Sequence, residues 1–153
     1  MTNSIQIDEV FDHVLVSITK TLADLDMVKV RPDGWKAENA LVETIYTNGS
    51  FDAYILCEIE PELFEYIVST MHGGSPPCKE EKPLYMNEYI NIICGRAVSI
   101  INNTTGYASR LSVPTFHGSV EEVDDIQPKA EQKVLLYGTV KGFMRIVINY
   151  TFR

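Results

Sequence analysis

Apolar and polar residues alternate along this chain with two different periods. Near the start, apolar residues recur at steps of three and four, the spacing of one face of an α-helix; they are Ile7, Phe11, Val14, Ile18, Leu22 and Leu25. From residue 41 to residue 59 the period falls to two, and Asn48-Gly49 interrupts the alternation. Because Asn-Gly between two alternating runs is a strong hairpin signal, the pattern predicts a helix over roughly residues 4–25 and a β-hairpin over 41–59.

Two more helices are expected in the middle of the chain. The segment "EPELFEYIVSTMHGG" has a proline suited to a first helical turn at Pro61 and a stop at Gly73-Gly74. After the loop "SPPCKEEKP", a long helical pattern begins beside Pro83 and runs to about Asn102. These two helices follow the first hairpin directly.

The last third of the chain returns to strand patterns. A strand is expected in "YASRLSVP", and a second hairpin in "KVLLYGTV" and "FMRIVINYTF", with Lys141-Gly142 at the turn. The resulting order is helix, hairpin, helix, long helix, strand, hairpin. It predicts one α+β domain over residues 1–153, a mainly antiparallel sheet of about five strands with three helices packed against it.

Composition narrows the classes of partner. The formal net charge is −8, which argues against nucleic acid or anionic lipid as the main partner, because both bind clustered Lys and Arg. No apolar run approaches the length of a membrane span, and the start lacks a basic segment followed by an apolar one. We therefore expect a cytoplasmic protein, whose three widely spaced cysteines are reduced thiols.

No motif indicates a metal or an intrinsic cofactor. The histidines at 13, 72 and 117 share no zinc-ligand spacing with cysteines or carboxylates. The acidic run "VEEVDD", residues 120–125, lacks the glycine and the regular oxygen spacing of a calcium loop. The sequence "HGGSPP" lacks the Lys-Ser/Thr pair of a phosphate-binding loop. The sequence predicts neither a metal site nor a bound cofactor.

The long helix has two different faces. Its expected core stripe consists of Met86, Ile90, Ile93, Ala97, Ile100 and Ile101. Glu88, Asn91 and Gly95 stand at i, i+3 and i+7 on the other side, where they should face solvent or a partner. A glycine inside a helix costs about 1 kcal/mol relative to alanine. Gly95 therefore needs a local reason, either the close approach of a partner or a helix crossing within the chain.

The pattern Glu88-x-x-Asn91-x-x-x-Gly95 within "NEYINIICG" resembles the phosphatase signature of the CheC, CheX and FliY family of bacterial chemotaxis. The likeness extends to the order of the amphipathic first helix, the "NGSFDAYILCEIEPELFEYIVSTMHGG" unit, the signature helix, "RLSVPTFHG" and the closing hairpin. It covers nearly the whole chain. The length of the chain and its single signature are most similar to those of CheX-like members.

The resemblance implies hydrolysis of the aspartyl phosphate of a CheY-like response regulator. In this role Asn91 would orient the attacking water and Glu88 would pair with the regulator's active-site lysine. Gly95 would leave room for the partner's surface, with Leu84, Asn87 and Ile92 as further contacts. The resemblance implies no intrinsic cofactor, since the Mg²⁺ is expected on the regulator, and it implies a homodimer.

Two positions depart from the family's pattern. Members usually have Asp or Ser four residues before the glutamate, where this chain has Leu84, and often a small residue where it has Asn87. Leu84 would be an apolar docking contact or the mark of a weakened enzyme. The alternative function is therefore a non-catalytic CheX-like adaptor that binds a response regulator or a signalling scaffold.

Overall fold

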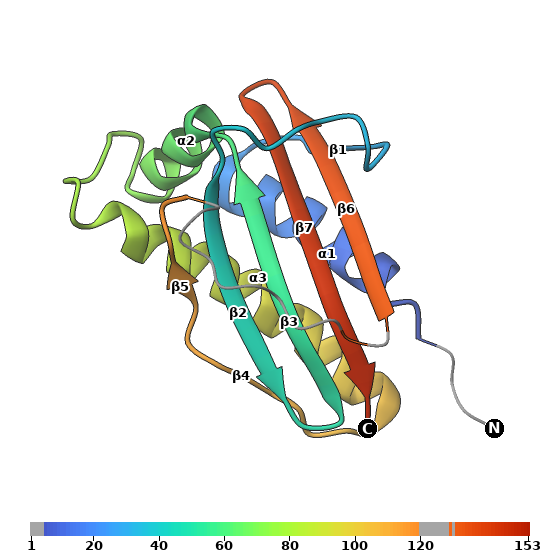
Figure 1. Cartoon of the computed structure of the whole chain (residues 1–153). Coiled ribbons are helices and arrows are strands. Elements are labelled where there is room, and N and C mark those ends of the chain that lie inside the picture. Colours follow the sequence, from blue (N-terminus) through green and yellow to red (C-terminus); the bar gives the residue numbers. More distant parts are fainter. Residues whose placement is uncertain (1–4, 120–128, 130) are drawn as a thin grey trace.

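The structure is a computed structural model that describes residues 5–119, 129 and 131–153. Within these residues, three helices cover one face of a seven-stranded antiparallel sheet (Figure 1). The acidic run at residues 120–125 lies outside the described residues. The elements are α1 (Ile7–Ala23), β1 (Val28–Val30), β2 (Leu41–Asn48), β3 (Phe51–Ile59), α2 (Pro61–Met71), α3 (Lys82–Thr105), β4 (Arg110–Leu111), β5 (Thr115–Phe116), β6 (Glu131–Thr139) and β7 (Gly142–Phe152). The predicted α+β class is confirmed.

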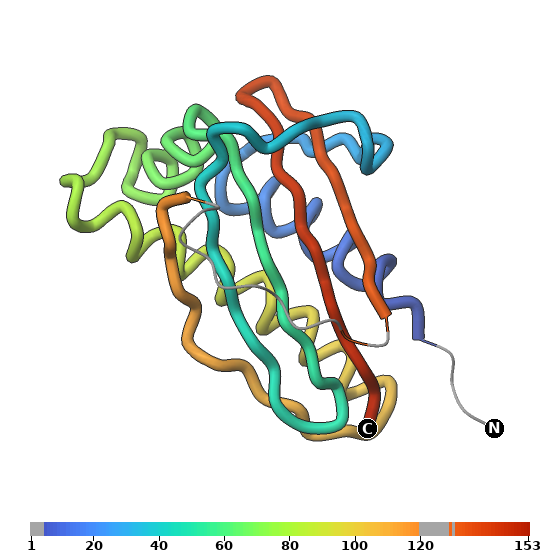
Figure 2. Tube along the Cα trace, viewed as in Figure 1, coloured from blue at the N-terminus to red at the C-terminus, as the bar shows by residue number. Residues whose placement is uncertain are grey.

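The sheet is built from two long hairpins laid side by side. The strand order is β1-β6-β7-β3-β2-β4, and β5 also pairs with β2. The central pair, β3 and β7, joins segments far apart in the sequence (Figure 2). In its register, Ile55 lies opposite Ile148. Because the last strand pairs with the first hairpin, the centre of the sheet forms only when residues 142–152 meet residues 51–59.

The core lies between the sheet and the helices. Alternate residues of β2 and β3 point toward the helices, as the period of two requires. The helix-facing residues of β3 are all buried: Phe51, Ala53, Ile55, Cys57 and Ile59. They meet apolar side chains of all three helices, including Phe11, Leu63, Ile67, Met86, Ile90 and Ile93. A large buried core fixes how α3 lies on the sheet.

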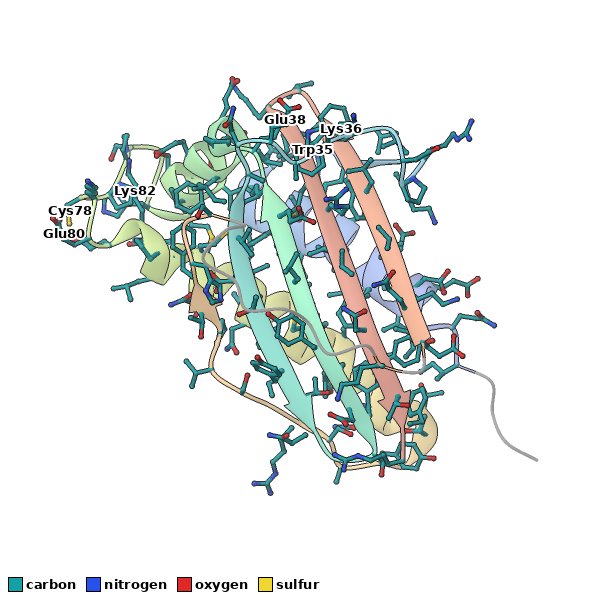
Figure 3. All side chains as sticks on the ribbon, in the orientation of Figure 1. Trp35, Lys36, Glu38, Cys78, Glu80 and Lys82 are labelled. Atoms are coloured by element: carbon teal, nitrogen blue, oxygen red, sulfur yellow. The ribbon has the colours of Figure 1, made fainter. Side chains whose placement is uncertain are left out.

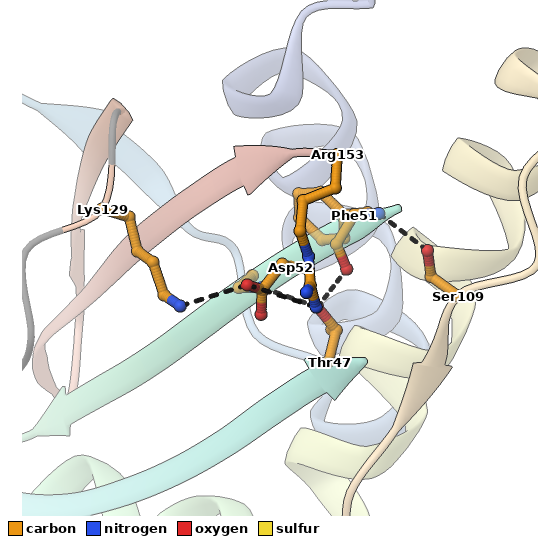
Figure 4. Close-up of polar contacts among 7 residues, drawn as sticks. Thr47, Phe51, Asp52, Ser109, Lys129 and Arg153 are labelled. Atoms are coloured by element: carbon orange, nitrogen blue, oxygen red, sulfur yellow. Dashed lines mark hydrogen bonds and ion pairs between the residues drawn. The ribbon is translucent and has the colours of Figure 1, made fainter. Parts of the chain in front are cut away.

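The turn between β2 and β3 requires glycine and is stabilised by polar contacts. Gly49 has φ of +122°, and a Cβ there would lie 2.9 Å from the Ser109 Cα atom. Thr47 donates to the Phe51 carbonyl at 2.6 Å, and the Phe51 N–H donates to the Ser109 hydroxyl at 2.9 Å (Figure 4). Lys129 lies 3.2 Å from the Asp52 carboxylate. The Asn-Gly hairpin is therefore confirmed.

Element boundaries differ from the expectation in four places. α1 is shorter than the expected residues 4–25, while α3 continues past Asn102 to Thr105, where Gly106 takes the left-handed conformation at φ +79°. The second turn is formed by Val140 and Lys141, so that Gly142 already belongs to β7. The strand expected in "YASRLSVP" is the two-residue β4, and a further two-residue strand, β5, follows that segment.

The loop between β1 and β2 is anchored by an aromatic side chain. The Trp35 ring stacks on Phe143 with 6.0 Å between centroids, and the Arg145 guanidinium lies 5.3 Å from its centroid. Figure 3 shows Trp35 near the end of the β6–β7 hairpin. Arg145 also forms an ion pair with Glu58 through two hydrogen bonds, each 2.8 Å long.

Among the described helices, none has the length and apolar character needed to cross a membrane.

Candidate functional site on α3

The outer side of α3 carries a row of accessible residues. Glu88 and Asn91 are exposed, Leu84 is 62% exposed, and Gly95 is half-buried. On the opposite side, Met86, Ile90, Ile93, Ala97 and Ile101 are buried, and Ile100 is half-buried. The two faces predicted from the helical spacing are confirmed. We call Leu84, Glu88, Asn91 and Gly95 the outer row.

Polar contacts to α2 and α1 hold α3 in place, one at its first turn and one next to Glu88. At its first turn, Lys82 forms an ion pair with Glu65 of α2 at 2.9 Å; Figure 3 shows Lys82 at the start of the helix. Tyr89, fully buried, shares a 2.6 Å hydrogen bond with Thr19 of α1. Burial raises the pKa of the Tyr89 hydroxyl, which stays protonated and able to donate.

Among the residues that the structure describes, none lies close enough to Gly95 to demand glycine there. A Cβ at this position would lie 3.6 Å from the Leu111 Cδ1 atom, an ordinary van der Waals contact, and would meet nothing closer. The proposed explanation of a helix crossing within the chain is therefore wrong. The remaining explanation is the close approach of a partner to the helix backbone at Gly95, one turn after Asn91.

Asn87 and Ile92, expected as partner contacts, flank the outer row and are both half-buried. Ile92 packs against the main core. The Asn87 amide faces inward to Glu43 of β2; with its nitrogen on that side, it donates to the two carboxylate oxygens at 2.6 and 3.1 Å. Asn87 therefore connects α3 to the sheet.

Glu43 is a buried acid in contact with Asn87 of α3, and the sequence analysis did not single it out. It is 1% exposed and sits on the helix-facing side of β2. Burial raises its carboxyl pKa from 4.5 to about 8. The signal was present, because in "LVETIYT" a glutamate occupies the phase of the apolar residues Leu41 and Ile45.

Two buried thiols lie in the same layer. Cys57 and Cys94 are free and buried, and burial, together with the nearby Glu43 carboxylate, raises the pKa of both. Protonated thiols are poor nucleophiles and poor metal ligands. No group of three His, Cys, Asp or Glu residues that could hold a metal ion exists in the described part of the chain. Within the outer row, the exposed polar side chains are those of Glu88 and Asn91.

Comparisons with known proteins identify the fold. Neither a protein-family model nor a curated protein matches the chain. Among solved structures, chemotaxis protein CheX from Vibrio vulnificus is 18% identical with a TM-score of 0.79, covering 97% of this chain and 99% of that chain. A CheC-like superfamily protein from Shewanella sp. PV-4 is 18% identical with a TM-score of 0.70 over the same shares.

A third neighbour was solved with a second protein. It is a chain of the CheX–CheY–BeF3–Mg²⁺ complex from Borrelia burgdorferi, 16% identical with a TM-score of 0.73, covering 97% of this chain and 99% of that chain. The similarity to all three structures extends over almost the full length of the described sheet and helices. The chain has the fold of CheX and CheC-like chemotaxis proteins.

Proposed function

We propose that this protein is a CheX-like phosphatase that hydrolyses the aspartyl phosphate of a CheY-like response regulator. The observation that carries the proposal is the outer row of α3, where Glu88 and Asn91 stand accessible one turn apart beside the half-buried Gly95. This row lies on the fold of the CheX and CheC-like proteins. A CheY-like partner is supported by the CheX–CheY complex among the structural neighbours.

The residue types suit this reaction. An acyl phosphate is a good electrophile, so the main requirement is a water molecule held in line with the bond that breaks. The amide of Asn91 has a donor and an acceptor with which to hold that water, without any change in protonation. The water oxygen bonds to phosphorus, the regulator's aspartate leaves with the electron pair of the P–O bond, and the water proton passes to the released phosphate.

Glu88 has a docking role in this proposal. Its exposed carboxylate pairs with the lysine of the regulator's active site through a charge-assisted hydrogen bond. The regulator carries the Mg²⁺ that balances the phosphoryl charge, so the phosphatase itself needs no cofactor. Gly95 keeps the α3 surface low enough for the regulator to approach the helix backbone.

The alternative function is a non-catalytic adaptor that binds the same kind of partner. It is favoured by Leu84, whose apolar side chain is 62% exposed at the first turn of the outer row. An exposed leucine beside two polar residues suits a docking contact. Both functions use the same surface. They differ in whether the phosphoryl group on the regulator's aspartate is hydrolysed.

Phosphate release from a regulator charged with acetyl phosphate in Mg²⁺ tests the proposal. Wild-type protein is expected to accelerate release. Asn91→Ala should lower the rate by roughly 100-fold while the regulator still binds, because only the water-orienting group is lost. Glu88→Ala should lower the rate and also weaken binding. Asn103→Ala replaces another exposed asparagine on α3, at its C-terminal end, and should change neither quantity.

The same assay separates the two functions. If wild type binds a regulator of the same organism but does not accelerate release, the protein is an adaptor. If Asn91→Ala hydrolyses as fast as wild type, the water-orienting mechanism is wrong.

A further inference from the structure

Glu43 is an acid placed where an apolar residue would be expected. It lies opposite Cys57 of β3 and Phe116 of β5 in the ladder, and it influences the ionisation of both Cys57 and Cys94. The charged or titratable groups that face it are these two thiols, and its hydrogen-bonding partner is Asn87. None of the ion pairs among the described residues includes Glu43, and burial alone accounts for its raised pKa. Within the described part of the chain, its surroundings therefore contain no cation that compensates an ionised carboxylate.

Such a residue opposes stability. Burying a carboxyl group without a cation costs free energy, and an apolar side chain of similar size would avoid that cost. Buried acids of this kind occur preferentially at functional sites. The position of Glu43 directly under the signature helix therefore calls for a role connected with that helix.

The contacts of the two residues beside Glu88 indicate what that role is. Asn87 is one turn before Asn91 on the same side of α3, and it immediately precedes Glu88. On the other side of Glu88, Tyr89 is hydrogen-bonded to Thr19 of α1 at 2.6 Å. Glu88 thus stands between two residues that are fixed inward, one to the sheet and one to α1. Rotation of α3 about its axis would break one of these contacts.

We propose that Glu43 is a positioning residue that acts through Asn87 to fix the rotation of α3, and with it the placement of Glu88 and Asn91. This inference rests on the proposed function. It adds to the outer row two residues behind it, the buried Glu43 and the half-buried Asn87.

Both protonation states of Glu43 allow the contact. With the Asn87 amide nitrogen turned toward it, an ionised carboxylate accepts from that nitrogen at 2.6 and 3.1 Å. A protonated carboxyl has one O–H, which can donate to the Asn87 oxygen once the amide has turned over. Glutamine can make either contact. An apolar side chain can make neither, and it leaves the half-buried Asn87 amide without its partner.

The test compares Glu43→Gln with Glu43→Met. Glu43→Met should fold with an equal or higher Tm, because methionine fills the site and has no charge to bury. Its kcat for phosphate release should fall about tenfold while its KM for the phosphorylated regulator stays within about twofold. Glu43→Gln should keep a kcat within about twofold of wild type. A tenfold loss of kcat in a variant of unreduced Tm would not follow from a purely structural role.

A second measurement needs no activity. In ¹H–¹⁵N NMR spectra, the side-chain amide of Asn87 should shift with pH in wild type, with its midpoint near the Glu43 pKa of about 8, and should be insensitive to pH in Glu43→Gln. The backbone signals of Glu88 and Asn91 should move in Glu43→Met.

The two measurements separate this inference from the proposed function. If wild type releases no phosphate from any regulator but these signals behave as stated, the phosphatase proposal fails and the positioning of α3 stands. If Glu43→Met keeps the wild-type kcat, or leaves the Glu88 and Asn91 signals unchanged, Glu43 does not position the helix.

Discussion

At the scale of single residues, the buried Glu43 carboxyl couples folding to pH. Its pKa is about 8 in the folded chain against an ordinary value of 4.5, so between these values the folded state binds more protons than the unfolded state. The free energy of unfolding should therefore be greatest below about pH 4.5 as far as this group is concerned, and should fall by up to about 1.4 kcal/mol per pH unit toward pH 8. Above that range its contribution should level off.

Urea unfolding at a series of pH values between 5 and 9 measures this effect, with Glu43→Gln as the matched control. Glutamine keeps the size and hydrogen bonding of the residue but cannot ionise, so the difference between the two proteins isolates Glu43. That difference should shift in favour of the glutamine variant as pH rises. A constant difference across the range would show that Glu43 titrates alike in both states.

Individual site residues differ in how far the sequence reveals them. Glu88 and Asn91 were predictable as a pair on an exposed face, because residues on one helix are related by a fixed spacing. The contact of Asn87 with Glu43 was not, because it joins two elements whose packing depends on the whole core. Residue type identified Asn87 as a departure from the family's pattern, and only the fold shows that its amide points inward.

At the scale of elements, α3 carries a glycine that weakens it. Since a Cβ at position 95 would make only an ordinary contact with Leu111, Gly95→Ala should stabilise the chain by roughly 0.5–1 kcal/mol through helix propensity. If the regulator approaches the helix backbone here, the same substitution should weaken regulator binding severalfold. Thermal unfolding and a titration with the regulator measure the two effects.

Gly106→Ala provides a matched control for that substitution. Gly106 ends α3 with φ of +79°, a conformation that alanine adopts only with strain, so this variant should lose stability. It lies at the C-terminal end of the helix, so it should bind the regulator as wild type does. Unchanged regulator binding in Gly95→Ala would contradict the role given to Gly95.

Long elements were predictable from the sequence, and short ones were not. Both hairpins and all three helices have many residues in phase, so a few exceptions do not hide the period. β1, with three residues, and β4 and β5, with two each, are too short to show a period. They are strands because neighbouring strands offer unpaired backbone groups, which is a property of the assembled sheet.

At the scale of the whole molecule, the two edges of the sheet are protected differently. Beside β2, the Ser112 N–H donates to the Tyr46 carbonyl at 2.8 Å, and the Ser112 hydroxyl accepts from the Tyr46 N–H at 2.9 Å. At the other edge, β1 pairs with residues 136–138 of β6 and no more. Among the described residues, the strand partner of residues 131–135 is β7 alone. An edge left open in this way favours pairing with another chain.

The homodimer implied by the sequence resemblance would therefore form through the first half of β6. Val140 and Lys141 form a two-residue turn, so the alternation of the ladder counted from it directs the Val134 N–H away from β7 and the Lys133 N–H toward β7. Val134→Pro should remove a donor from the open edge and give a folded monomer in sedimentation velocity. Lys133→Pro should remove a β6–β7 hydrogen bond and lower the Tm. If Val134→Pro still sediments as a dimer, the interface lies elsewhere. If wild type is monomeric, the protein forms no homodimer and the outer row of α3 acts in single chains.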